Sequence, residues 1–245
     1  MDALPRICVR EGVKPGPLRL GEAQAKHLTG ARRLRAGDAF LVFSGDGREY
    51  RAEIEATARG SVQATVGALT RQEPLPALEL EIWCANVRAN RMEWAIEKCV
   101  ETGADIFRPI TCERTARGQE LSAGRRERWE RIAIEAAEQC GRLHLPRIEA
   151  LTPFADACKR LRGPLVLADP DGGPWSTIAP LLPERGTLTV AIGPEGGFSE
   201  GEVAEARAAG TLIASLGPNT LRTETAAAVA TALVRTHTAA ASGGR

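Results

Sequence analysis

The sequence of 245 residues predicts an α/β protein with a small β-rich N-terminal domain and a larger layered domain built on a parallel sheet. Two observations carry this prediction. Within the first 72 residues, short β-rich runs alternate with turn residues, which is typical of a small antiparallel sheet or barrel. From about residue 80, strand and helix patterns alternate, and three late apolar runs are short and continuous, as in strands buried on both faces.

The N-terminal strands are expected at 39–43, 48–55 and 61–69. The tetrapeptide SGDG at 44–47 separates the first two and predicts a hairpin. Residues 1–72 carry 12 basic and 8 acidic side chains, which favours contact with a polyanion through this part of the chain. The segment EPLPALE, residues 73–79, contains two prolines and indicates a linker.

The second domain is expected to open with a strand at 80–87 and a helix that begins at Asn90 and ends at Gly103. Glu93 would complete a capping box in that helix. Further along, Ser199 and Glu202 form a second capping box. The remaining elements are expected to be a strand at 105–111, a helix at 125–141, strands at 164–170, 188–194 and 212–218, and helices at 199–210 and 223–237. Trp94 and Trp129 are expected on the buried stripes of their helices.

Three of these strands end in loops rich in glycine and proline, at 169–173, 193–197 and 217–219. Because the carboxyl ends of parallel strands share one edge of a sheet, we expect one composite pocket there. G-x-G-x-x-G and the P-loop pattern are both absent, and Glu195 disfavours a phosphate by repulsion. The middle loop therefore suits a phosphate-free ligand such as S-adenosylmethionine, or is a tight turn with a solvated Glu195.

The six cysteines include no C-x-x-C pair, and the chain has only three histidines. We therefore expect neither a metal site nor a redox motif. The sequence shows no signal-like start and no apolar run of membrane-spanning length, so a cytoplasmic protein is expected.

Two C-terminal segments resemble the paired signatures of a known family. IGPEGGFSEGE (192–202) and SLGPNTLRTETAAAVA (215–230) are similar to those of the RsmE family, the 16S ribosomal RNA uridine-N3 methyltransferases of the SPOUT superfamily. The resemblance extends through RMEWAIEKCVETG (91–103), ITCERT (110–115) and RWERIAIEAAEQCGR (128–142), and to PRICV, KHLTGARRLRAGD and DGREYRAEI near the N-terminus.

The resemblance implies a PUA-like β-barrel at 1–72, a linker at 73–79 and a SPOUT methyltransferase domain at 80–245 whose end forms a trefoil knot. It also implies a homodimer that binds S-adenosylmethionine and acts on 16S ribosomal RNA, without a metal or a membrane. The residues expected to bind the cofactor are Leu167, Ala168, Gly193, Glu195, Gly196, Gly197, Ser215, Leu216, Gly217 and Leu221. Asn219 and Thr220, and the Arg88-Ala89-Asn90 segment, depart from the usual family pattern.

Methylation of uridine N3 requires loss of a proton and stabilisation of charge on O2 and O4. Arg222 is the candidate cation, with a structural ion pair to Glu224 or another carboxylate as the alternative role. Glu195 and Glu224 are candidate bases, although Glu224 also suits the first turn of a helix.

Contacts to RNA are assigned to basic and polar side chains. The candidates are Arg6, Lys26, Arg32, Arg33, Arg35, Arg88, Arg114, Gln139 and Arg142. A solvated charged face is the alternative for the N-terminal cluster. Contact with the partner subunit is the alternative for Arg114, Gln139 and Arg142. Two other functions stay open: a SPOUT ribose methyltransferase acting on transfer RNA, and a non-catalytic RNA-binding assembly factor.

Overall fold

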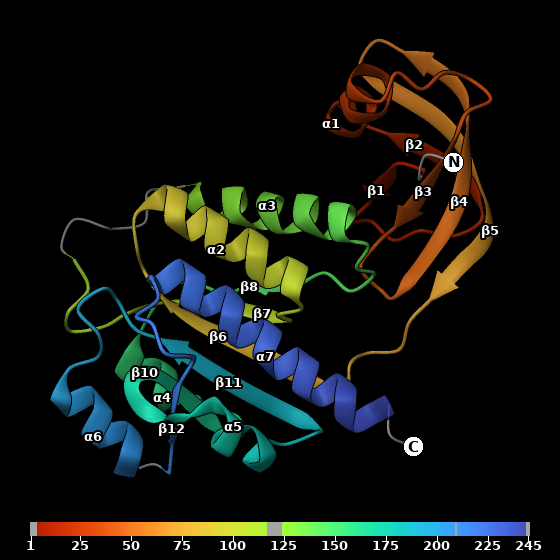
Figure 1. Cartoon of the computed structure of the whole chain (residues 1–245). Helices are drawn as coiled ribbons and strands as arrows, with labels where there is room; N and C mark the ends of the chain where they lie inside the picture. Colours follow the sequence, from red (N-terminus) through yellow and green to blue (C-terminus); the bar gives the residue numbers. More distant parts are fainter. Residues whose placement is uncertain (1–3, 117–123, 209, 244–245) are drawn as a thin grey trace. The chain divides into compact units, whose positions relative to one another are not determined.

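The computed structural model describes residues 4–116, 124–208 and 210–243 (Figure 1). The chain divides into two compact units, Met1–Leu75 with Ala137–Leu145, and Pro76–Ala136 with Pro146–Arg245. Residues 137–145 thus belong to the first unit, whereas the predicted boundaries include them in the domain at 80–245. The boundaries 1–72, 73–79 and 80–245 stay a prediction.

The first unit contains a sheet in the order β1-β3-β4-β5-β2, counted over the described residues. Its strands are β1 (Arg6–Cys8), β2 (Gly16–Leu20), β3 (Ala39–Phe43), β4 (Arg48–Ala58) and β5 (Ser61–Gln72). Pairing is antiparallel except between β1 and β3. The predicted hairpin is confirmed, because Phe43 pairs with Glu49 across the SGDG turn. A short helix α1 (Glu22–Ala25) continues into a π-helical turn, Lys26–Ala31. Phe40, Val42 and Leu28 lie in the core of this unit.

The second unit is built on a parallel sheet in the order β12-β10-β11-β6-β7-β8, with β9 also paired to β7. The strands are β6 (Leu78–Ala85), β7 (Ile106–Thr111), β8 (Arg147–Ile148), β9 (Thr152–Pro153), β10 (Leu165–Pro174), β11 (Gly186–Ile192) and β12 (Leu212–Ser215). The helices are α2 (Ala89–Thr102), α3 (Arg125–Cys140), α4 (Phe154–Cys158), α5 (Trp175–Ile178), α6 (Glu200–Ala208) and α7 (Thr223–Gly243), with a 3₁₀ turn at Ala179–Leu181. The α/β class with a parallel sheet is therefore confirmed.

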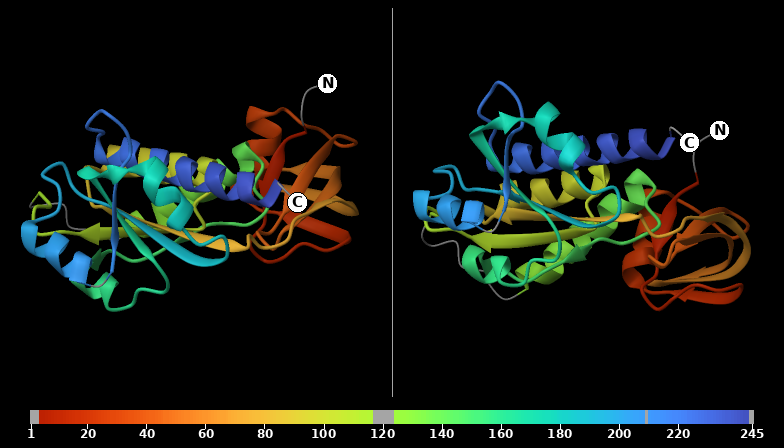
Figure 2. Two further views of the ribbon diagram at one scale, coloured as in Figure 1. Left: turned by 60° about the horizontal axis from the view of Figure 1, so that its bottom comes forward. Right: turned by 90° about the horizontal axis from the view of Figure 1, so that it is seen from below.

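Helices cover both faces of this sheet. On one face, Trp83 packs edge-on against Phe154 of α4, in a cluster that also takes in Ala206 of α6. Ile82 and Cys84 alternate with Trp83 along β6 and point to the opposite face. There α2 and α7 lie side by side (Figures 1 and 2). None of the helices within the described residues has the length and apolar character that crossing a bilayer needs.

The structure corrects two predictions for helix α2, the capping box at its start and the burial of Trp94. Arg88 is the N-cap residue of this helix and no side chain caps it, so the box formed by Asn90 and Glu93 is wrong. Glu93 instead accepts two hydrogen bonds from Arg128 of α3. Trp94 is 41% exposed, because the buried face of α2 is formed by other residues, whereas Trp129 is buried as expected.

The predicted loop at 169–173 is also corrected, because β10 continues through it as an irregular strand to Pro174. Its pairing with β12 shifts between Ala168 and Gly173. At Gly172 a Cβ atom would lie 2.7 Å from the carbonyl carbon of Ala214, so only glycine fits against the neighbouring strand.

Candidate functional site

A cavity of about 300 Å³ lies at the carboxyl ends of β10, β11 and β12. The three chain segments meet there because β10 pairs with both other strands, with Ala168 opposite Ile192 on one side and Ala214 on the other. The lining residues are Ala168–Pro170, Ile192–Glu195, Gly197, Phe198, Ser215–Gly217, Asn219–Thr223 and Ala226. The composite pocket expected from the sequence is therefore present.

Most of the expected cofactor residues line this cavity. They are Ala168, Gly193, Glu195, Gly197, Ser215, Leu216, Gly217 and Leu221. Leu167 is fully buried in the core below, and Gly196 faces the side chain of Arg114, so neither lies on the cavity wall. Phe198 and Thr223 also line the cavity, although the sequence did not predict this, and Asp169 was expected there only as part of the loop at 169–173.

The central glycine loop, residues 193–198, is held in a defined turn. The amide of Gly197 donates a hydrogen bond of 2.8 Å to the carbonyl of Pro194, and Gly197 has a φ of 69°, which glycine adopts without strain. Thr223 Oγ1, at the start of α7, donates to the carbonyl of Gly193 at 3.0 Å. Beyond the loop, the predicted box of Ser199 and Glu202 at the start of α6 is confirmed by reciprocal hydrogen bonds.

The two candidate bases share one arginine that sequence reasoning did not single out. Arg91 Nη1 lies 2.9 Å from Glu195 Oε1, and Arg91 Nε lies 3.6 Å from Glu224 Oε1. Glu195 is half exposed at the cavity, whereas Glu224 is buried and lies off the cavity wall. The ion pair of Glu224 is therefore with Arg91, and the alternative pairing of Arg222 with Glu224 is wrong.

Arg222 is exposed and lines the cavity. Its side chain makes no hydrogen bond or ion pair with the residues that the structure describes. Its charge is therefore available to a ligand or substrate group in the cavity. Of the other lining side chains, Glu195 and Asp169 are acidic, which disfavours phosphate and suits a neutral or cationic ligand.

Comparisons with known proteins agree with this geometry. The RNA methyltransferase domain family matches residues 73–235, and the RNA methyltransferase PUA domain family matches residues 20–67. Ribosomal RNA small subunit methyltransferase E from Synechocystis sp. is 33% identical over 236 residues, covering 93% of this chain and 76% of that protein. The protein of the same name from Bacillus subtilis is 30% identical over 213 residues, 83% of each chain. The chain belongs to the ribosomal RNA small subunit methyltransferase E (RsmE) family.

Solved structures of similar fold match almost the whole chain. A methyltransferase from Legionella pneumophila, solved with bound S-adenosylmethionine, has a TM-score of 0.87 at 27% identity and covers 96% of this chain and 98% of its own. A small subunit methyltransferase E from Neisseria gonorrhoeae, also bound to S-adenosylmethionine, has a TM-score of 0.83 at 25% identity and covers the same shares. The predicted family, the PUA-like domain and the SPOUT-type domain are confirmed. The trefoil knot and the homodimer stay predictions.

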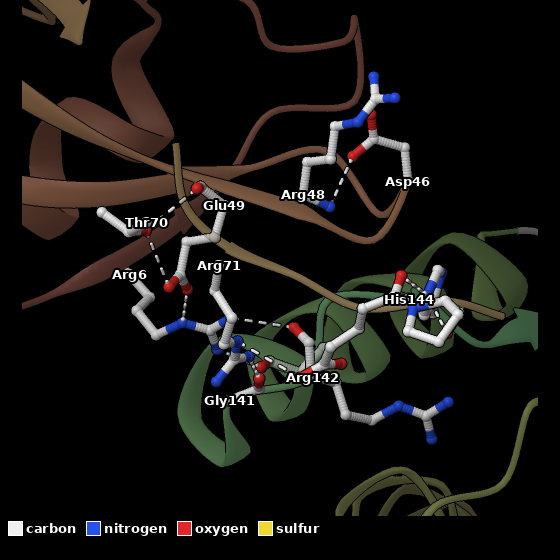
Figure 3. Close-up of polar contacts among 12 residues, drawn as sticks. Arg6, Asp46, Arg48, Glu49, Thr70, Arg71, Gly141, Arg142 and His144 are labelled. Carbon is white, nitrogen blue, oxygen red and sulfur yellow. Dashed lines mark hydrogen bonds and ion pairs between the residues drawn. The ribbon is translucent and has the colours of Figure 1, made fainter. Parts of the chain in front are cut away.

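One basic residue of this RsmE-family chain has a role other than the expected RNA contact. Arg6 exposes only 12% of its side-chain surface and forms an ion pair of 2.7 Å with Glu49 (Figure 3). Its Nη1 donates to the carbonyls of Ala137 and Glu138, and its Nη2 donates to the carbonyl of Arg142. Arg6 thus binds carbonyls at and just after the end of α3 through Nη1 and Nη2, while its Nε is paired with Glu49, and this full set of partners argues against a contact to phosphate.

The other predicted RNA contacts differ in exposure. Lys26, Arg32, Arg33 and Arg35 are exposed around the π-helical turn of the first unit, and Arg33 has a left-handed φ of 57°. Gln139 and Arg88 are exposed, and Arg142 is half-buried. Arg114 donates two hydrogen bonds to the glycine loop.

No group of His, Cys, Asp and Glu residues that could hold a metal ion occurs within 4–116, 124–208 and 210–243.

Proposed function

We propose that this chain is an S-adenosylmethionine-dependent methyltransferase that modifies N3 of one uridine in 16S ribosomal RNA. The observation that carries the proposal is the cavity formed by three glycine-bearing segments at the carboxyl ends of β10, β11 and β12. Two similar structures are bound to S-adenosylmethionine, and the curated relatives are named as small subunit ribosomal RNA methyltransferases.

The cavity fits the proposed methyl donor in size and charge. A volume of about 300 Å³ lies in the range of small-molecule sites. Backbone groups of Gly193, Gly197 and Gly217 are accessible in the wall because these residues carry no side chain. The acidic side chains of Glu195 and Asp169 suit a ligand that carries a sulfonium cation and no phosphate.

In the proposed reaction, the N3–H bond of uridine breaks and N3 forms the bond to the methyl carbon. Bound S-adenosylmethionine would supply this methyl group from its sulfonium. The sulfur would keep the electrons of the S–C bond and become a neutral thioether. Arg222 stabilises the negative charge that develops on O2 or O4. Glu195 accepts the N3 proton, since its carboxylate lies on the cavity wall and that of Glu224 does not.

Ribosomal RNA would be held largely by phosphate contacts in the first unit. Lys26, Arg32, Arg33 and Arg35 are exposed within ten residues of sequence and offer four positive charges. Binding of this kind weakens as salt concentration rises. An enzyme acting on ribosomal subunits works in the cytoplasm, and we propose that location.

The proposed homodimer has a candidate face on α7. Beside the buried stripe of this helix, Ala228, Val229, Ala232 and Leu233 are only half-buried. Leu233 also borders a second hollow with Trp175 and Pro174. A second copy of the chain would remove this apolar surface from water, and the mass measured by light scattering tests this part of the proposal.

The test is incubation with methyl-labelled S-adenosylmethionine and either assembled small subunits, naked 16S RNA or transfer RNA, followed by mapping of the labelled atom. We expect label on N3 of a single uridine of the small-subunit RNA. Label only on transfer RNA would contradict the proposed substrate. Binding of the methyl donor without transfer to any of the three RNAs would instead favour a non-catalytic factor.

A further inference from the structure

The turn after β7 is held by hydrogen bonds within itself and to α6. Within Cys112–Thr115, the Cys112 amide donates to Thr115 Oγ1 at 2.8 Å, and the Thr115 amide donates to the Cys112 carbonyl at 3.0 Å. The Glu113 amide donates to Glu202 Oε1 at 3.0 Å, while Glu202 Oε2 accepts from the Ser199 amide. The turn is therefore closed on itself and attached to the first turn of α6.

Arg114 extends from this turn onto the glycine loop. Its Nη1 donates hydrogen bonds to the carbonyls of Gly196, at 3.0 Å, and Phe198, at 3.2 Å. Its stem covers Gly196, because a Cβ atom there would lie 3.4 Å from Arg114 Cβ and 3.6 Å from Arg114 Cδ. Among the described residues, these two carbonyls are the only hydrogen-bond partners of the Arg114 side chain.

The two carbonyls that Arg114 binds flank Gly197, and both Gly197 and Phe198 line the cavity. The other end of the same loop is held at Gly193 by Thr223. The loop is thus fixed at both ends by side chains from different parts of the second unit. Charge-assisted bonds to carbonyls are stronger than neutral ones, so Arg114 contributes more to the loop conformation than a neutral donor would.

We propose that Arg114 is a positioning residue for the methyl-donor loop, and that it does not contact RNA. The guanidinium holds the carbonyls of Gly196 and Phe198, while Gly197 and Phe198 line the cavity. Without Arg114, the loop samples other conformations and the site loses part of its preorganisation. This inference rests on the proposed function, because the ligand of the loop is taken to be S-adenosylmethionine.

The experiment compares Arg114→Ala, Arg114→Lys and wild type in two separate binding measurements. Calorimetry with S-adenosylmethionine gives the donor affinity without RNA, and a filter or fluorescence assay with 16S RNA at several salt concentrations gives the RNA affinity and its salt dependence. We expect Arg114→Ala to raise the Kd for S-adenosylmethionine about tenfold, with Arg114→Lys intermediate because lysine keeps the charge but not the planar fork. The RNA affinity and its salt dependence should not change.

Each result bears on the inference. A phosphate contact predicts the reverse pattern, with unchanged donor affinity, weaker RNA binding and a salt slope smaller by about one; that outcome would overturn the proposal. Arg162→Ala is the matched control, since Arg162 is exposed and precedes β10 at the amino end of the sheet. If wild type itself binds no S-adenosylmethionine, the proposed function fails. If circular dichroism shows that Arg114→Ala is unfolded, the donor and RNA affinities of Arg114→Lys are compared with those of wild type instead.

Discussion

Charge at the cavity is divided unequally among its arginines and carboxylates. Arg91 lies between Glu195 and Glu224, so most of its charge is compensated. Arg222 lines the cavity without a partner among the described residues, so its charge is available to substrate. A guanidinium does not lose its proton in proteins, and it can stabilise the charge that develops on a substrate oxygen.

Arg222→Ala is predicted to lower kcat about a hundredfold or more, because one donor to the developing oxyanion is lost. The Kd for S-adenosylmethionine should change only a few-fold, since backbone groups form much of the donor site. Single-turnover methylation of 16S RNA measures the rate, and calorimetry measures donor binding. Arg222→Lys, which keeps the charge, should recover part of the rate. A normal rate for the alanine variant would exclude Arg222 as the charge stabiliser.

At the scale of elements, the site depends on how three segments are joined to one another. The irregular end of β10, the glycine loop after β11 and the start of α7 all line one cavity. Arg91 at the start of α2 connects the second and third of these segments through Glu195 and Glu224. Because Glu224 is buried, the loss of its cation leaves a charge without compensation, which costs more than the loss of an exposed ion pair.

Arg91→Ala is predicted to lower the free energy of unfolding by about 1–3 kcal/mol. Adding Glu224→Gln to that variant should restore part of the loss, because the amide removes the uncompensated buried charge. Glu195→Gln in the same background is the control, and it should restore little, since Glu195 is half exposed. Urea unfolding followed by circular dichroism measures all four proteins. Equal recovery by the two glutamine variants would contradict this account.

At the scale of the whole molecule, stability depends on cores that contain buried thiols in both units. Burial raises the pKa of Cys8 to about 11 and that of Cys99 to about 12. Burial also raises the pKa of Cys158 to about 11 and that of Cys84 well above the usual value for a thiol. The folded protein therefore keeps these protons at pH values where the unfolded chain has already lost them.

Stability is accordingly predicted to fall as pH rises from about 9 toward 11. The unfolded thiols ionise near pH 9 while the folded thiols stay neutral, so deprotonation favours the unfolded chain. Thermal unfolding at several pH values measures the decline. A Cys8→Ala, Cys158→Ala double variant should show a shallower decline than wild type. An identical decline would assign the effect to other groups, such as Lys and Tyr.

The sequence alone determined the class of the fold and the position of the site. Hydrophobic periodicity depends on local geometry, so the strand runs, the hairpin at SGDG and the box of Ser199 and Glu202 were all predictable. The glycine-rich loops after the parallel strands located the cavity, because the shared direction of the strands fixes the edge of the sheet at which these loops meet. Resemblance of the motifs added the family, which similarity over most of the chain confirmed.

Only the tertiary structure decided which side chains of similar chemistry have partners. The sequence predicts an RNA contact for both Arg6 and Arg114, yet Arg6 binds carbonyls at the end of α3 and Arg114 binds the glycine loop. The partners of Arg6 and Arg114 are mostly backbone carbonyls more than 80 residues away along the chain, and no local pattern encodes such contacts. The same reason explains Trp94, whose exposure depends on which face of α2 the sheet and α7 cover. Periodicity locates a helix, but long-range packing decides which of its faces is buried.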